Sequence, residues 1–222
     1  MSDLSTWTPR ERPEPVTLEG RYVRIEPLSS AHYSDLYALT GEAAPDVDWT
    51  YLPAAEPIGL ANFWMTMAPL VDSEEDIAYA VTPLEGPASG RVAGTMSFLR
   101  IDPRHGQVEV GWVLLGEGLR GTRAATEALH LLMRYAFDDL GYRRFEWKCD
   151  SANEPSRSAA SRLGFTYEGR FRHHMVIKGR NRDTDWFSIT EDEWPLVKAR
   201  HEAWLAPDNF DASGQQRERL AR

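Results

Sequence analysis

Three features that mark particular classes of protein are scarce or missing in this sequence. Cys149 is the only cysteine, so no disulfide can form within the chain, and a cytoplasmic location is the default expectation. No apolar run approaches the roughly 20 residues that a membrane-spanning helix needs, which argues against a membrane partner. Lysines and arginines number 25 against 34 aspartates and glutamates, and the net charge of -9 argues against general nucleic-acid binding.

The composition that remains is that of an ordinary globular protein. Hydrophobic residues make up 42% of the 222 residues and charged residues 27%, which fits one domain with extensions. Residues 1–15 are polar, contain three prolines and show no apolar segment like that of a signal peptide. We expect an N-terminal arm over 1–15, one domain over 16–205 and a polar C-terminal tail over 206–222.

Alternating and helical patterns of apolar residues predict the secondary structure. Strands are expected over 16–27, 76–82, 91–101, 107–115, 143–149, 165–172 and 185–189. Helices are expected over 29–40, 59–71, 124–140, 156–163 and 191–205, with 41–58 irregular. This order predicts a mixed α/β protein in which an antiparallel meander precedes strand–helix crossovers. A crossover places the strands on either side of the helix over 124–140 parallel to each other.

A turn with glycine and two arginines, Leu119–Ala125, lies between a strand and the strongest predicted helix. Helix N-termini present unpaired N–H groups and the positive end of a dipole, so they attract phosphate. Arg120 and Arg123 add charge for contacts to phosphate. The turn is therefore the best candidate for an anion site. The alternative is an ordinary strand-to-helix turn with solvated arginines.

Four segments, in this order and spacing, resemble one protein family. They are Leu18-Glu-Gly-Arg-Tyr-Val-Arg-Ile-Glu-Pro-Leu28, Glu109-Val-Gly-Trp with Arg120-Gly-Thr-Arg-Ala-Ala-Thr-Glu-Ala128, Asn153-Glu-Pro-Ser156 with Arg162-Leu-Gly-Phe165, and Lys178-Gly-Arg-Asn-Arg-Asp183 with Trp186-Phe-Ser-Ile and Glu193-Trp194. The chain resembles the GNAT acyltransferase superfamily, in the branch that includes the ribosomal-protein N-terminal acetyltransferases. The resemblance covers residues 16–205. It implies a mixed, mostly antiparallel central sheet flanked by helices, with a splay between the fourth and fifth strands, 107–115 and 143–149.

The resemblance implies an acetyl-CoA-dependent N-acetyltransferase in which an amine attacks the thioester directly. Acetyl-CoA is the co-substrate, no metal is expected, and the partner is a small-molecule or peptide amine; a homodimer is left open. The cofactor-binding residues implied are Val113, Leu114, Leu115, Arg120, Gly121, Thr122, Arg123, Ala124, Ala125, Asn153 and Ser156. Two alternatives stay open: a non-catalytic acyl-CoA-binding module, and an acyltransferase that uses a longer acyl group such as succinyl-CoA.

Two positions depart from the family pattern. Arg123 stands where the family's turn usually has glycine, whose small size lets backbone approach a pyrophosphate closely. Many members have a tyrosine four positions after Ser156 that serves as the acid, and here that position is Ala160. Ser156, a water molecule or no dedicated acid are the alternatives for protonating the leaving thiolate.

Glu109 is the sharpest candidate for a catalytic base. An amine must be neutral to attack a thioester, and a carboxylate on the cofactor strand can take its proton, directly or through water. Gly111 shares a strand face with Glu109 and leaves room for a substrate. The alternative is a structural glutamate held by an arginine of a neighbouring strand.

The remaining candidates have weaker signals. Trp49 and Tyr51 lie in the region that lines the acceptor site in this family, although loop aromatics also tuck into a nearby core. Asn153 and Ser156 are also good helix caps. His173 and His174 are adjacent and lack metal-ligand spacing, so they are expected to be structural or substrate-lining.

Overall fold

The computed structural model describes residues 4–40, 47–116, 118–212 and 214–220. Its strands are β1 (Leu18–Glu19), β2 (Val23–Pro27), β3 (Ile77–Pro83), β4 (Gly94–Asp102), β5 (Gln107–Leu115), β6 (Arg144–Asp150), β7 (Thr166–Ile177) and β8 (Arg180–Thr190). Its helices are α1 (Tyr33–Thr40), α2 (Val47–Thr50), α3 (Gly59–Val71), α4 (Arg123–Arg134), α5 (Glu154–Arg162) and α6 (Trp194–Leu205), with short helices at Ser30–His32, Tyr135–Asp139 and Pro207–Asn209.

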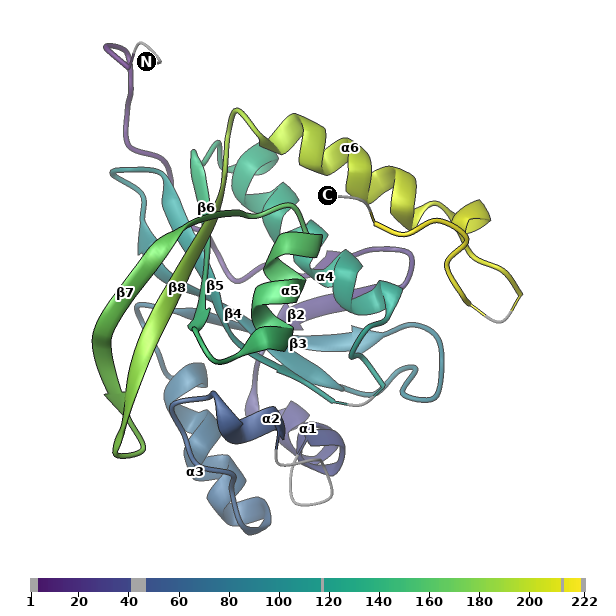
Figure 1. The fold of residues 1–222 in the computed structure, drawn as a ribbon. Helices are drawn as coiled ribbons and strands as arrows, with labels where there is room; N and C mark the ends of the chain where they lie inside the picture. The colour runs from purple at the N-terminus through teal and green to yellow at the C-terminus, as the bar shows by residue number, and fades with distance from the viewer. Residues whose placement is uncertain (1–3, 41–46, 117, 213, 221–222) are drawn as a thin grey trace.

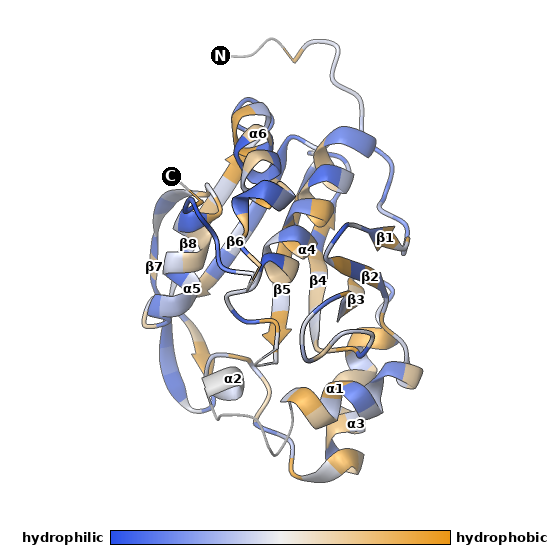
Figure 2. Ribbon diagram, turned by 90° about the vertical axis from the view of Figure 1, so that its right-hand side faces the viewer, coloured by the Kyte–Doolittle hydropathy of each residue, from blue (hydrophilic) through white to orange (hydrophobic). Residues whose placement is uncertain are grey.

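The strands form one sheet in the order β1-β2-β3-β4-β5-β6-β8-β7 (Figure 1). β5 and β6 pair in parallel, which confirms the crossover predicted for the helix between them, and the other neighbours pair antiparallel. Successive residues of a strand face opposite sides. Val108 and Val110 of β5 share the larger core with α4, whereas Ala78 and Ala80 of β3 share a second core with residues of α1 and α3. Helices therefore cover both faces (Figure 2).

The pairing between β5 and β6 ends halfway along both strands. Register runs from Gln107 opposite Arg144 to Val110 opposite Trp147 and goes no further, although β5 continues to Leu115 and β6 to Asp150. β5 bulges on its β4 side between the rungs at Gly111 and Leu114, and Trp112 in this bulge has a φ of 47°. A bulge bends its strand and increases its twist. The expected splay between the fourth and fifth predicted strands is thus present.

Several expected elements differ from those observed, and the helix expected over 124–140 is divided into α4 and the short helix Tyr135–Asp139. The strand expected over 16–27 is broken into β1 and β2, because the carboxylate of Glu127 on α4 accepts hydrogen bonds from the N–H groups of Arg21 and Tyr22. A Cβ at Gly20 would collide with that carboxylate. β7 and β8 extend well beyond 165–172 and 185–189 and form one long curved hairpin (Figure 1).

The segment expected to be irregular over 41–58 contains the short helix α2, and its residues 41–46 lie outside the described part of the chain. The chain ends pack onto the domain in the described ranges. In the N-terminal segment, the Nε of Arg10 donates to the Gly141 carbonyl. In the C-terminal segment, Phe210 and Leu220 are buried, and the Phe210 ring meets Trp204 edge-on at 5.2 Å. No helix among the described residues combines the length and the apolar character needed to cross a membrane.

Two buried histidines make the core sensitive to acid. His130 on α4 and His201 on α6 have ring centroids 5.5 Å apart, and burial lowers the pKa of each from 6.5 to about 4. The unfolded chain therefore binds these two protons more readily than the folded one. We expect the contribution of these two histidines to the free energy of unfolding to be constant above about pH 6.5 and to fall as the pH drops from there toward 4. Urea denaturation at a series of pH values measures it.

His130→Leu removes one of the two titrations and should flatten the fall between about pH 6.5 and 4.5. The matched control is His105→Gln, since His105 is exposed in the β4–β5 turn. A wild-type stability that is equal at pH 7.5 and pH 4.5 would contradict the prediction.

Candidate active site

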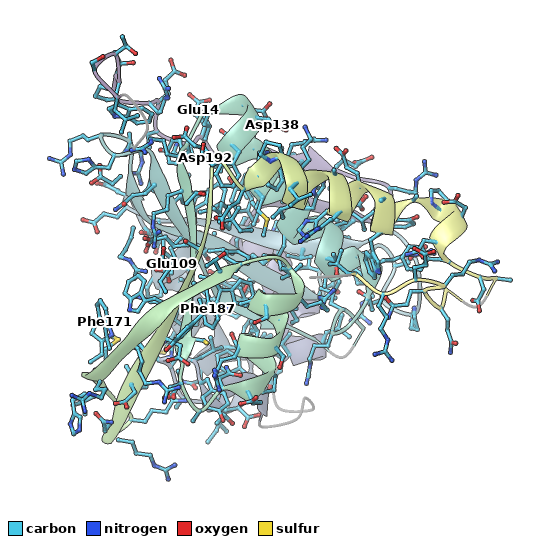
Figure 3. All side chains as sticks on the ribbon, turned by 45° about the horizontal axis from the view of Figure 1, so that its top comes forward. Glu14, Glu109, Asp138, Phe171, Phe187 and Asp192 are labelled. Atoms are coloured by element: carbon cyan, nitrogen blue, oxygen red, sulfur yellow. The ribbon has the colours of Figure 1, made fainter. Side chains whose placement is uncertain are left out.

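The splay opens beside a buried carboxylate. Glu109 lies one rung before the last paired residue of β5, opposite Glu146 of β6, and its side chain is on the face away from α4 (Figure 3). Just past the last paired rung, Gly111 of β5 and Lys148 of β6 stand on the two sides of the opening. A Cβ at Gly111 would meet Leu99 and approach the Glu109 carboxylate to 3.2 Å. The absence of a side chain at Gly111 therefore lets the Leu99 side chain and the Glu109 carboxylate lie against the strand there.

Glu109 is 1% exposed and its charge is held by two cations. The Arg100 guanidinium of β4 contacts its carboxylate directly, and the Nζ of Lys148 lies 3.7 Å from Oε2. Arg100 has a φ of 45° and sits in a bulge where β4 gains a residue relative to β5, between the rungs at Leu99 and Asp102. This contact is the arrangement of the structural alternative, an arginine from a neighbouring strand. The base role of Glu109 stays a prediction.

Lys148 is a residue that the sequence reasoning missed. Its ammonium lies 5.5 Å from the centre of the Trp186 ring, which is its partner across β6 and β8. Burial, followed by the charges of Arg100 and Arg182, lowers the pKa of Lys148 to about 8. The available signal was strand alternation: Phe145, Trp147 and Cys149 face the core, which turns Glu146 and Lys148 to the opposite face.

The predicted anion-binding turn has the backbone of a helix start. Gly121 has a φ of 72°, and the Thr122 hydroxyl caps α4 by accepting from the Ala125 N–H at 3.3 Å. In the described part of the chain, no group accepts a hydrogen bond from the N–H groups of Arg123 or Ala124, which lie in the first turn of α4. These donors are therefore directed to where an anion would bind. Arg120 lies beside them and donates through Nε to the Leu115 carbonyl at 3.0 Å.

The two nearby arginines on helices differ in what they contact. The guanidinium of Arg123 forms a two-point ion pair with Glu85, at 2.6 Å for its second contact, and stacks on the rings of Tyr22 and Phe210. Its charge is thus used within the protein, not at the turn. Arg162 of α5 lies 3.4 Å from the Thr126 hydroxyl, near the start of α4, and pairs with no carboxylate among the described residues.

Arg162 is a second residue that the sequence reasoning left without a role, although it belongs to one of the quoted motifs. Burial lowers its pKa. A cation at the positive end of a helix dipole is unfavourable unless an anion is also there. Arg162 is also the last residue of α5, where the negative end of that helix favours a cation, so its charge is stabilised beside the start of α4 and could be shared with an anion there.

Ser156 and Asn153 connect α5 to the edge of the splay. The Asn153 side chain accepts from the Ser156 N–H at 3.1 Å, so it caps α5. The Ser156 hydroxyl accepts from the indole N–H of Trp147, the last residue of β6 that pairs with β5, at 3.0 Å. Cys149 also contacts Ser156, and burial raises the pKa of its thiol to about 11, which leaves it protonated at neutral pH.

Trp49 and Tyr51, the expected acceptor-site aromatics, have different surroundings. Trp49 is 1% exposed, packs edge-on against Phe63 and donates its indole N–H to the Thr40 carbonyl, so its side chain belongs to the second core. The Tyr51 hydroxyl donates to the Ala152 carbonyl, one residue before Asn153. The Nζ of Lys178, at the tip of the β7–β8 hairpin, donates to the Trp49 carbonyl at 2.7 Å. Three separate segments therefore meet beside the splay.

Comparison with known proteins identifies the family to which this fold belongs. The family model described as "Acetyltransferase (GNAT) domain" matches residues 23–166. The chain belongs to the GNAT family. A solved GCN5-related N-acetyltransferase from Brucella melitensis is 46% identical, with 98% of this chain and 97% of that chain covered and a TM-score of 0.94. The resemblance drawn from the four motif segments is confirmed.

Two curated relatives of this GNAT protein match over shorter stretches. The uncharacterised N-acetyltransferase p20 of Bacillus licheniformis is 36% identical over 103 residues, 46% of this chain. YdaF of Bacillus subtilis (strain 168), provisionally named a ribosomal N-acetyltransferase, is 30% identical over 105 residues, 47% of this chain. The chain spans 57% of the length of each. Within the described residues, no group of three or more His, Cys, Asp or Glu side chains is placed to hold a metal ion.

The contact between Arg100 and Glu109 should stabilise the fold. We expect Arg100→Gln to lower the free energy of unfolding by about 2 kcal/mol, because it leaves a buried carboxylate with a weaker partner. A fully buried pair would lose roughly 3–5 kcal/mol, but the Arg100 side chain is 41% exposed and Lys148 still faces Glu109. Urea denaturation at neutral pH measures the difference.

Arg104→Gln is the matched control, since Arg104 pairs with Asp102 in the same hairpin but is 79% exposed. Arg104→Gln should lower the free energy of unfolding by less than about 0.5 kcal/mol. The double variant Arg100→Gln, Glu109→Gln should recover most of the loss. Equal costs for the two arginine variants would show that the Arg100–Glu109 pair contributes nothing.

Proposed function

We propose that this GNAT protein transfers an acetyl group from acetyl-CoA to an amine. Two adjacent features support it best. The parallel strands β5 and β6 stop pairing halfway along their length, and a glycine turn and the start of α4 follow directly after β5. The opening offers backbone groups to an extended chain, and the helix start offers N–H donors to phosphate. One elongated ligand with a pantetheine arm and a pyrophosphate suits both.

The proposed cofactor-binding residues fall into two groups, one for the pantetheine arm and one for the pyrophosphate. The pantetheine arm pairs with the backbone of Val113, Leu114 and Leu115 as an added strand, and Asn153 contacts it from α5. The pyrophosphate accepts from the backbone N–H groups of Arg123 and Ala124, and the turn residues Gly121, Thr122 and Ala125 lie around it. Arg120 and Arg162 supply the positive charge, because the Arg123 guanidinium is engaged with Glu85.

The reaction proposed is a direct transfer. The amine nitrogen attacks the thioester carbonyl, the N–C bond forms and the C–S bond breaks, so that one proton leaves the amine and one joins the CoA sulfur. Holding the two reactants together supplies much of the rate. A backbone N–H of Val113 or Leu114 stabilises the developing oxyanion.

Two side chains are proposed for the protons. Glu109 takes the amine proton through its carboxylate, directly or through water, from an amine held beside Gly111. Ser156 gives a proton to the leaving thiolate. Because the Trp147 indole donates to the Ser156 oxygen, the hydroxyl hydrogen is left to donate either to the Cys149 sulfur that it contacts or to the thiolate. The amine enters where α2, the β6–α5 loop and the β7–β8 hairpin meet, beside Tyr51.

Calorimetric titration tests the cofactor assignment. We expect acetyl-CoA and CoA to bind, and Arg162→Gln to weaken the affinity for both by about 10-fold, the effect of one charge-assisted phosphate contact. The comparison variant is Arg123→Gln, which should lower thermal stability through its lost pair with Glu85 but change CoA affinity by less than about 3-fold.

Three outcomes decide against the proposal. If no CoA species binds, the cofactor assignment fails. Tight binding without thiol release over a panel of amines favours the non-catalytic module. Faster thiol release from succinyl-CoA than from acetyl-CoA favours the enzyme with a longer acyl group.

The pH–rate profile of Glu109→Gln tests the base. We expect kcat to fall by about 100-fold, which is typical of a lost general base, with the affinity for acetyl-CoA unchanged. Glu146→Gln is the neighbouring control, because Glu146 faces the same side of the sheet but pairs with Arg144. Full turnover of Glu109→Gln at all pH values would remove Glu109 as the base.

A further inference from the structure

A group of cations surrounds one aromatic ring on the face of the sheet that Glu109 shares. The ring is that of Trp186 on β8. Lys148 lies 5.5 Å and the Arg100 guanidinium 5.1 Å from its centre. Trp186, Thr184 and Arg182 alternate along β8 on the face away from the core, because Phe187 and Ile189 point into it. Arg182 lies two alternations before Trp186 on this face, and its charge adds to burial in lowering the pKa of both Lys148 and Arg100.

Two donors in this group are buried without a partner. The Nε of Arg182 and the indole Nε1 of Trp186 are both inaccessible to solvent, and neither makes a hydrogen bond to any part of the chain that the structure describes. An unsatisfied buried donor costs about 1–3 kcal/mol, so such donors are rare in native proteins. The two donors lie on the same face of β8 with Thr184 between them, and acceptor atoms of a ligand would satisfy both.

The carboxylates nearby are already committed to other cations. Glu109 is held by Arg100 and Lys148, and Glu146 pairs with Arg144 at 2.6 Å. Asp76 is the further acid whose charge acts on Arg100, from the β3 side. Over the described residues, Arg182 has no carboxylate within ion-pair distance. Its positive charge therefore faces the site uncompensated.

Apolar and neutral side chains border the same place. The Phe171 ring on β7 packs against Trp186 at 5.3 Å and is 54% exposed (Figure 3). His174 packs against both rings, and its Nδ1 lies 3.0 Å from the Thr184 hydroxyl. Burial and the charges of Lys148, Arg182 and Arg100 lower the pKa of His174, so it is mainly neutral at pH 7. An apolar portion of a ligand can lie against Phe171 while its charged end meets Arg182.

We propose that the acceptor is an amine that also bears a carboxylate, such as an amino acid, and that Arg182, Lys148 and the Trp186 indole N–H hold that carboxylate. A guanidinium binds a carboxylate in two-point geometry, and the indole can only donate. The carboxylate would anchor the acceptor past the splay, with its amine toward Glu109 and Gly111. This assignment rests on the proposed acetyl transfer, and it argues against a polyamine acceptor.

Three amines with one aromatic ring test the proposal: L-phenylalanine, L-phenylalaninamide and phenethylamine. We expect kcat/KM for phenylalanine to exceed that for either other amine by about 10-fold or more, mainly through KM. The amine of the amide is less basic, so the supply of neutral amine alone would favour the amide. Arg182→Gln should reduce the preference below about 3-fold, and Trp186→Phe, which keeps the ring but removes the N–H, should reduce it in part.

Arg180→Gln is the matched control, because Arg180 lies on the same strand but is exposed at the hairpin tip. It should keep the full preference. Equal use of phenylalanine and its amide, a preference for spermidine, or an unchanged preference in Arg182→Gln would overturn the proposal.

Binding without turnover separates this proposal from the proposed reaction. We expect 3-phenylpropanoate, which has the ring and the carboxylate but no amine, to bind the CoA-loaded protein. Its Kd should rise about 10-fold in Arg182→Gln, and 3-phenylpropanamide should not bind. If CoA binds but no amine releases thiol, the transfer reaction fails while this titration still measures the carboxylate site. If 3-phenylpropanoate does not bind the CoA-loaded protein, the carboxylate site itself is refuted.

Discussion

The loss of hydrogen bonding between β5 and β6 beyond Val110 and Trp147 is the constraint on which the site depends. Backbone N–H and C=O groups without a partner are costly away from water, so a sheet stays paired unless something bends a strand. Here the bulge around Trp112 bends β5 on its β4 side, while β6 remains paired with β8 along its whole length. β5 therefore bends away from β6, which is held in place by β8, and the opening lies inside an otherwise continuous sheet.

The opening has a buried charged side chain beside it, although protein interiors usually exclude charge. Glu109 is buried, and ionised groups are buried only when they are paired. The β4 bulge at Arg100 is what brings a guanidinium to it, so two bulges, on adjacent strands, shape the same few residues. A bulge in each strand redirects side chains that strict alternation would send elsewhere. The geometry of the site is therefore encoded in backbone irregularities as much as in residue identity.

Local sequence patterns were sufficient to predict most helices and strands of the domain. The limits of α3 and β5 agree with the predicted ranges, since each has a clear apolar period and a turn at its ends. The motif spacing was sufficient for the family and the splay. Contacts between residues far apart were not predictable: Glu127 breaking the first strand, Arg100 reaching Glu109, and Glu85 engaging Arg123. Lys148 and Arg162 lacked a role in the sequence because a lone cation on a strand or helix is usually solvated.

The position of Arg123 links two parts of the molecule that are far apart in the chain. It is the first residue of α4, and its guanidinium joins Glu85 of the β3–β4 turn to the Phe210 ring in the C-terminal segment. The N–H groups of the helix start and the docking of that segment therefore share one residue. By thermodynamic reciprocity, a ligand at the helix start whose affinity depended on this docking would stabilise the docked segment by the same free energy.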